Sequence, residues 1–231
     1  GSYLANVLRL SDDERRTLLL AGAAGGIGAI FRSPLGGALF AVEVLYKRDF
    51  EAKSLIPALV SSIVAYSIFA SRFGWGLMFD TPRYVFNHPV ELLFYALFGV
   101  ICAVVGIAYI KFFYGLRDLF QGIRIPPQLR PALGGLLVGI VGVFAPHVLA
   151  SGYGYLQQAM NGQLAIQFML VAMVLKILVT SFTISSGGSG GVFAPSLFIG
   201  GMLGGAFGQL AAQLFPNLIY TPNAFVLVGM G

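Results

Sequence analysis

Residues 185 to 195 read SSGGSGGVFAP, and an apolar run, SLFIGGMLGGAFG, follows at once. Four glycines within five positions interrupt a helix, because glycine is among the poorest helix formers. The stretch nevertheless lies between two strongly hydrophobic segments. Inside a membrane, non-helical backbone is tolerated only where protein buries it or where it lines a water-filled cavity. The stretch therefore predicts a helix broken at a functional position, if the chain is a membrane protein.

The composition indicates a membrane protein that crosses the bilayer several times. The chain has 231 residues, of which 57% are hydrophobic and only 10% charged, and its mean hydropathy is +0.84. A soluble domain normally carries about 25% charged residues. The net charge is +5, but the basic residues lie in short loops between apolar segments, as topology signals do. We therefore expect no nucleic-acid partner.

The apolar segments differ in length. Residues 18–31 and 34–46 form two segments that are each too short to cross about 30 Å of hydrocarbon, so we expect a re-entrant pair. The sequence SDDE at 11–14 is a helix-start signature, a serine cap followed three residues later by glutamate. Longer segments that predict membrane spans are residues 55–73, 90–119, 131–149, 164–184 and 192–215. Basic residues at the ends of these segments, all assigned to the cytoplasmic side by the positive-inside rule, include Arg9, Arg15, Arg16, Lys47, Arg48, Lys53, Arg117, Arg124 and Arg130.

The glycine break has the features of an anion site. A helix beginning near Val192 or Phe193 tolerates Pro195 in its first turn, because the missing N–H would have no partner there. The first N–H groups of that helix carry the positive end of its dipole. The upstream glycines lack side chains, so an ion can approach bare amides. The alternative is a flexible cytoplasmic loop before an ordinary span. The glycine stretch contains no lysine or arginine, which argues modestly against such a loop.

Two motifs carry a resemblance to a known family. GGVFAP at 190–195 resembles the G-x-F-x-P signature of CLC-type chloride channels and chloride/proton antiporters, and residues 22–43 are similar to another stretch of that family. The resemblance implies an all-α polytopic bundle of inverted repeats with broken and re-entrant helices. It further implies a homodimer in the plasma (inner) membrane that carries chloride and needs no cofactor. The implied anion site comprises Gly190, Gly191 and the backbone amides of Val192 and Phe193.

The resemblance also divides the chain into parts. Residues 1–72 correspond to the end of the first inverted repeat, 73–89 to an external connecting loop, and 90–231 to the start of the second repeat. The chain thus resembles an internal fragment. Further elements of the family's pore are expected upstream of Gly1 and downstream of Gly231.

The residue after Glu43 bears on the transport mode. Antiporters of the family usually carry a second acid directly after the glutamate that Glu43 matches, and here that position is Val44. A buried proton relay needs titratable groups or ordered water. We therefore expect a passive, voltage-gated-type anion channel, with a chloride/proton antiporter as the alternative. Lys176, in the middle of a span, either adds positive potential to the anion pathway or neutralises an acid such as Glu43.

Two other classes of function remain as rivals. GGSG at 187–190 matches the G-x-S-G of rhomboid-type serine proteases, with Ser189 as nucleophile, but His88 and His147 both precede Ser189, unlike the histidine of those enzymes. A different inverted-repeat transporter, for an organic anion or a cation, is the second rival. A cation carrier needs carboxylates within its spans, and Glu43 is the candidate that we weigh for that role. We expect neither an enzyme nor a metal site.

Overall fold

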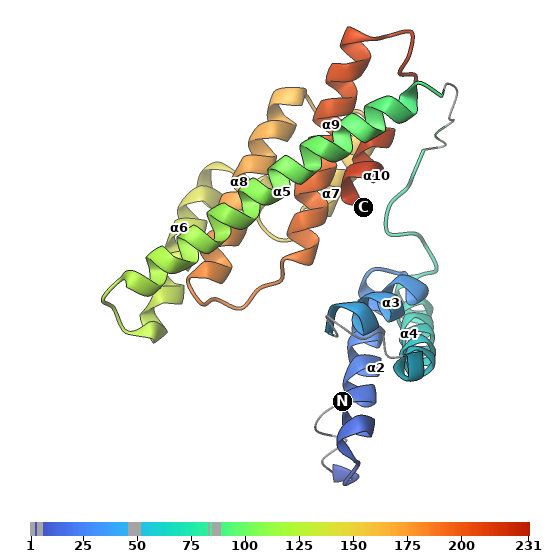
Figure 1. The fold of residues 1–231 in the computed structure, drawn as a ribbon, viewed down its shortest axis with the longest axis vertical. Coiled ribbons are helices and arrows are strands. Elements are labelled where there is room, and N and C mark those ends of the chain that lie inside the picture. Colours follow the sequence, from blue (N-terminus) through green and yellow to red (C-terminus); the bar gives the residue numbers. More distant parts are fainter. Residues whose placement is uncertain (1–2, 4–6, 46–51, 83, 85–88) are drawn as a thin grey trace. The chain divides into compact units, whose positions relative to one another are not determined.

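The chain folds into two compact units of helices (Figure 1). The computed structural model describes residues 3, 7–45, 52–82, 84 and 89–231. The first unit is Gly1–Asp80 and the second Thr81–Gly231, so the division falls inside the expected connecting loop. The assignment of the units to two inverted repeats stays a prediction. Lys47, Arg48 and His88 lie outside the described residues.

The first unit contains three helices, α2 (Asp12–Ile30), α3 (Pro34–Leu45) and α4 (Ala52–Phe73). The capping box expected at the start of α2 is present: the Ser11 hydroxyl accepts from the Glu14 amide, and the Ser11 amide donates to the Glu14 carboxylate at 2.9 Å. The Ser11 hydroxyl also donates to the Glu14 carboxylate, at 2.7 Å, and this bond together with that from the Ser11 amide holds the pKa of the Glu14 carboxyl below its ordinary value. The sequence signature therefore located this helix start.

Small residues bring the helices of the first unit close together. A Cβ atom added to Gly28 of α2 would lie 1.8 Å from the Ser62 hydroxyl of α4. One added to Gly37 of α3 would lie 2.5 Å from the backbone nitrogen of Gly28. Both α3 and α4 therefore pack on the same glycine of α2, and a larger residue there would displace Ser62. With 12 residues, α3 is too short to cross a membrane alone.

The second unit is a bundle in which α8 and α9 lie side by side and α5 packs against both (Figure 1). The short helices α7 and α10 pack on α9, and α6 packs on α8. Its elements are α5 (Glu91–Gly122), η1 (Pro127–Leu129), α6 (Arg130–Phe144), η2 (Pro146–Val148), α7 (Tyr153–Met160), α8 (Ile166–Ser185), α9 (Phe193–Leu214) and α10 (Ala224–Met230). The sequence did not predict α7 or α10, which are too short to show an apolar segment of their own.

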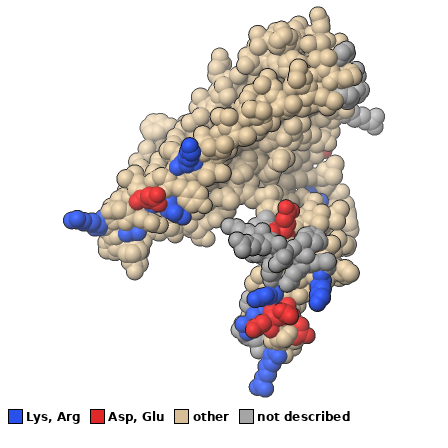
Figure 2. Space-filling view, in the orientation of Figure 1, with Lys and Arg blue, Asp and Glu red and all other residues tan. Residues whose placement is uncertain are grey.

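Length and composition confirm a multi-pass membrane protein. Within the described residues, five helical stretches are long and apolar enough to cross a bilayer: Lys53–Phe73, Glu91–Gly122, Pro127–Phe144, Ile166–Ser185 and Phe193–Leu214. In Figure 2 the charged side chains visible on the second unit gather at the end where α5 joins α6. Near the junction of α5 and α6 the sequence has Arg117, Asp118, Arg124 and Arg130. Their position at the end of the spans agrees with the loop predicted there.

A stripe of glycines joins α9 to α10. Added Cβ atoms at Gly200, Gly204 and Gly208 would lie 1.8, 1.9 and 2.0 Å from backbone carbonyl oxygens that belong to α10 or directly precede it. The backbone of this segment therefore rests directly on the glycines of α9, as the GxxxG spacing predicts. This packing fixes α9, the helix whose first turn forms the candidate site.

Candidate anion site

The glycine break is present between α8 and α9. Helix α8 ends at Ser185, α9 begins at Phe193, and residues 186–192 are not helical. Gly187 has a φ of +92°, in the region that favours glycine, and a Cβ on Gly188 would lie 2.6 Å from the Thr183 carbonyl oxygen. The first pair of glycines thus makes the turn after α8.

The second pair of glycines has a different role. Gly191 has no positive φ, and a Cβ added there would meet nothing within 4 Å. A Cβ added to Gly190 would make ordinary van der Waals contacts at 3.4 Å or more. Gly190 and Gly191 therefore leave open space rather than provide an unusual backbone conformation.

The first turn of α9 begins at the predicted position. Val192 is the N-cap residue, it is 49% exposed, and its side chain makes no capping hydrogen bond. The Ser196 amide and hydroxyl both donate to the Val192 carbonyl, at 2.9 and 2.8 Å, which closes the first turn. The leading N–H groups of an α-helix have no partner within the helix and carry the positive end of its dipole. This end of α9 therefore attracts negative charge.

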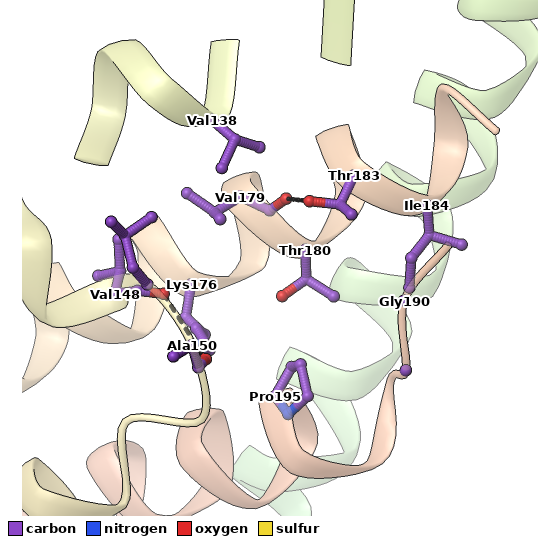
Figure 3. Close-up of a pocket in the computed structure, with 12 residues that line it drawn as sticks. Val138, Val148, Ala150, Lys176, Val179, Thr180, Thr183, Ile184, Gly190 and Pro195 are labelled. Atoms are coloured by element: carbon purple, nitrogen blue, oxygen red, sulfur yellow. Dashed lines mark hydrogen bonds between the residues drawn. The ribbon is translucent and has the colours of Figure 1, made fainter. Parts of the chain in front are cut away.

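A cavity of about 290 Å³, here called the α8–α9 cavity, lies beside the break (Figure 3). It is bounded by one face of α8, by the glycines before α9, by Pro195 and by the segment that follows α6. The lining residues are Val138, Val148, Leu149, Ala150, Lys176, Val179, Thr180, Thr183, Ile184, Gly190, Gly191 and Pro195. Two of the predicted site residues, Gly190 and Gly191, thus share a cavity with a third, Lys176.

Lys176 is buried in the middle of α8, with 2% of its surface exposed. Its ammonium donates to the backbone carbonyls of Val148, at 2.8 Å, and Ala150 (Figure 3). It also lies 5.2 Å from the centroid of the Phe198 ring. A buried charge in a span is costly unless it is paired or faces water. Carbonyl dipoles and the ring stabilise the charge here, without any carboxylate among the lining residues of the cavity.

The segment held by Lys176, residues 148–152, forms one wall of the α8–α9 cavity, and we call it the strap. Ala150 has a φ of +53°, a conformation that costs energy for a residue with a Cβ. Gly152 has a φ of +72°, and a Cβ there would lie 2.4 Å from the Phe198 ring. The strap is therefore clamped between Lys176 and Phe198 in a conformation that it would not adopt unaided.

A second cavity, of about 430 Å³, lies on the other side of the first turn of α9. Val192 and Ser196 line it together with Gly106, Tyr109, Ile110, Phe113 and Tyr114 of α5. The Tyr109 hydroxyl is buried with no hydrogen-bond partner among the described residues. The predicted anion-binding residues are thus divided: Gly190 and Gly191 line the first cavity, and Val192 lines the second.

The remaining candidates lie elsewhere. Glu43 is exposed near the end of α3, in the first unit, so its pairing with Lys176 stays a prediction. The His147 ring packs against Tyr155 and Phe168, at 5.7 and 4.8 Å between centroids, and burial lowers its pKa. Within the described part of the chain, no hydrogen bond joins His147 to Ser189, and no group of three or more potential metal ligands occurs. The protease arrangement therefore gains no support.

Sequence reasoning missed the strap and Thr180. The contacts of Lys176 with the strap join residues more than 25 positions apart, and no local pattern announces them. Thr180 lines the same cavity, and its position four residues after Lys176 places both on one face of α8. That spacing was a usable signal.

Comparisons with known proteins identify the family. The family model described as voltage gated chloride channel matches residues 1–231. A ClcB-like chloride channel protein of Ralstonia nicotianae is 33% identical over 100% of this chain and 54% of its own length. The H(+)/Cl(-) exchange transporter ClcA of Vibrio campbellii is 29% identical over 100% of this chain and 51% of its own.

The fold comparison gives the same result. The crystal structure of a slow cyanobacterial Cl-/H+ antiporter, 23% identical, superposes with a TM-score of 0.84 over 100% of this chain and 55% of that one. The chain therefore spans about half the length of the proteins that it matches. The expected all-helical fold with broken helices is thereby confirmed. The chain belongs to the family of voltage-gated chloride channels, the CLC family.

Proposed function

We propose that the protein containing this chain moves chloride across a membrane, with the anion held at the start of α9. The observation that carries the proposal is the glycine break before α9, where a helix start without a capping side chain meets a cavity containing a buried ammonium. Backbone amides attract an anion without the full charge that would trap it, which rapid transport requires. In this proposal Val192 and Phe193 contribute the amides, and Gly190 and Gly191 keep the approach open.

The transport mode that we propose is chloride/proton exchange. Passive conduction was expected because Val44 replaces an acid, but a relative that matches the whole chain is named an H(+)/Cl(-) exchange transporter. That name supports the antiporter over the channel, although the Ralstonia relative is named for a channel. A protein with valine at position 44 would then pass protons through another group or through ordered water.

The experiment uses the full-length protein in liposomes loaded with chloride. With valinomycin present to carry the compensating potassium, we expect chloride efflux well above that of chloride-loaded liposomes without the protein. Chloride efflux equal to that of the protein-free liposomes would refute the transport function. A chloride gradient should also drive protons against their own gradient, as read by a pH-sensitive dye. Chloride efflux without proton movement would contradict exchange and indicate a passive channel.

Assembly and location complete the proposal. We propose a homodimer, as the resemblance to the family implies, in the plasma membrane, as bacterial relatives suggest. The exposed apolar side chains on α4, among them Ile56, Val60 and Ile68, provide surface for lipid or for a second subunit. Chemical cross-linking in native membranes tests the dimer, and a monomer at all protein densities would contradict it.

A further inference from the structure

The chain exposes large apolar side chains directly after α4. Phe73 is the last residue of a candidate membrane span, and it is 67% exposed. Trp75 and Leu77 follow, at 68% and 77%. We call residues 73–77 the 73–77 segment. Such a concentration of apolar side chains is unfavourable in water and is typical of a surface that contacts protein or lipid.

Gly74 turns the 73–77 segment back toward the helix. Its φ of +91° lies in the region that favours glycine, and its amide donates to the Ala70 carbonyl at 2.8 Å, a common ending of an α-helix. The Trp75 ring then packs edge-on against the Tyr66 ring of α4, with 5.7 Å between centroids. Tyr66 precedes the last residue of α4 by about two turns, or roughly 10 Å of helix. Trp75 therefore points back along α4 rather than away from it.

Arg32 holds the 73–77 segment from a second direction. Its guanidinium donates to the Gly76 carbonyl at 2.7 Å and lies 5.8 Å from the centroid of the Phe69 ring. Arg32 belongs to the turn between α2 and α3, where its φ of +51° is costly for a residue with a Cβ. Such a conformation persists only where the surroundings fix it. The segment is thus tied both to α4 and to the turn between α2 and α3.

Two arginines at this end of α4 indicate the chemistry of the partner. Arg72 lies in the last turn of α4 and is exposed, and Arg32 has N–H donors beyond the one that reaches Gly76. Among the residues that the structure describes, neither arginine forms an ion pair. Residues 73–82 contribute one acid, Asp80. A phospholipid presents a phosphate, which arginine binds well, directly beside apolar acyl chains.

The apolar face of α4 leads into the 73–77 segment, which favours lipid over a second copy of the chain. Ile56, Val60, Val64 and Ile68 recur at every fourth position of α4, and each is more than half exposed. Arg72 takes the next position. Spans in contact with lipid are apolar through the hydrocarbon and carry tryptophan where the headgroups begin. A second copy of this surface offers the same arginines instead of acids to pair with them.

We propose that the 73–77 segment is a lipid anchor at the C-terminal end of α4. Trp75 lies in the interface between the headgroups and the acyl chains, and Arg72 contacts phospholipid phosphates. Through its hydrogen bond to Gly76, Arg32 holds the turn between α2 and α3 at a fixed depth in the bilayer. With 12 residues, α3 is too short for its own length to set that depth. The inference concerns the bilayer, so it holds whichever ion the protein moves.

The test measures Trp75 fluorescence in the full-length protein, reconstituted into phosphatidylcholine liposomes whose acyl chains are brominated at a chosen depth. Subtracting the spectrum of Trp75→Phe isolates the emission of this exposed ring, and Trp75→Tyr serves the same purpose if Trp75→Phe does not fold. The hydrocarbon core is about 30 Å thick, so an interfacial ring lies about 15 Å from the bilayer centre. Bromine near the headgroups should therefore quench Trp75 roughly twofold more strongly than bromine at the chain ends.

Acrylamide, a quencher dissolved in water, separates the contradicting outcomes. Trp75 emission that acrylamide quenches and brominated lipid does not shows a segment in water and overturns the anchor. Emission that neither quencher reaches shows a segment covered by protein, such as a second copy, and also overturns it. Equal quenching by shallow and deep bromine overturns the interfacial position. None of these results bears on chloride efflux, so the proposed function is tested separately.

Arg32→Met tests the tie to the turn between α2 and α3. Methionine cannot donate to the Gly76 carbonyl, so the preference of Trp75 for shallow bromine should fall by roughly half. Arg16→Met is the matched control, an exposed arginine of α2 whose loss leaves that hydrogen bond in place, and it should keep the preference. An unchanged preference in a folded Arg32→Met would overturn the tie. Should Arg32→Met not fold, Gly76→Ala crowds the same contact, because its Cβ would lie 3.0 Å from the guanidinium, and should have the same effect.

Discussion

Replacing Lys176 by methionine tests whether one buried ammonium holds the strap in place. Methionine has a similar length but no donor, so the Val148 and Ala150 carbonyls both lose a charged partner. Hydrogen bonds to charged groups contribute about 1.5–3 kcal/mol each. We take the lower value for each bond, because the released carbonyls can turn toward the cavity. Loss of the two hydrogen bonds then destabilises the closed strap by about 3 kcal/mol. The left-handed backbone conformation of Ala150 then loses two of the contacts that maintain it.

A loss of about 3 kcal/mol makes local opening of the strap roughly a hundredfold more frequent. Hydrogen–deuterium exchange of the full-length protein measures this directly, because the Val148 and Leu149 amides donate to turn carbonyls and are protected while the strap is closed. Exposed Lys111 on α5 offers the matched control, and Lys111→Met should leave strap exchange unchanged. Strap exchange in Lys176→Met within about threefold of the parent would refute the clamp.

Three further predictions concern the glycines and the first helix start. Gly191→Val should abolish chloride efflux in a folded protein, because the valine side chain would fill the open space at the cavity through which the anion approaches; normal efflux would contradict this. Gly187→Ala, at a φ of +92°, should instead lower the free energy of unfolding by about 1–2 kcal/mol. Gly204→Ala places a Cβ 1.9 Å from the Phe225 carbonyl oxygen and should cost about 1–3 kcal/mol in thermal unfolding, while Gly99→Ala, with nothing within 4 Å, should cost nothing. Ser11→Ala removes the cap of α2 and should cost about 1 kcal/mol in the same assay, and an unchanged transition would show that the cap contributes nothing.

Sequence patterns located the helices because apolar length and caps are local signals. The spans expected at 164–184 and 192–215 were found as Ile166–Ser185 and Phe193–Leu214. The span expected at 131–149 ends earlier, at Phe144, because Pro146 starts a separate 3₁₀ turn. The helix Ala224–Met230 has seven residues and no side-chain cap, so packing on the glycine stripe, a tertiary effect, supports it.

The candidate site was predicted only where the signal was local. A proline and four glycines mark the break, and the break is where the sequence placed it. The four glycines look equivalent in the sequence, yet Gly187 and Gly188 make the turn while Gly191 borders a cavity. The carbonyls that accept from Lys176, those of Val148 and Ala150, belong to the segment between α6 and α7, far from Lys176 in the sequence. Neither the mid-span position of Lys176 nor its charge therefore revealed these partners.

The clamp on Lys176 also has an electrical consequence. A charge that moves through the whole membrane field changes its energy by about 2.3 kcal/mol per 100 mV, and such movement makes a protein sensitive to voltage. The Lys176 ammonium, in contrast, is fastened to the strap and to the Phe198 ring of α9. While the clamp holds, the charge keeps its depth at every voltage. If the protein transports anions as proposed, we expect Lys176 to give them a constant attractive potential and to contribute no gating charge.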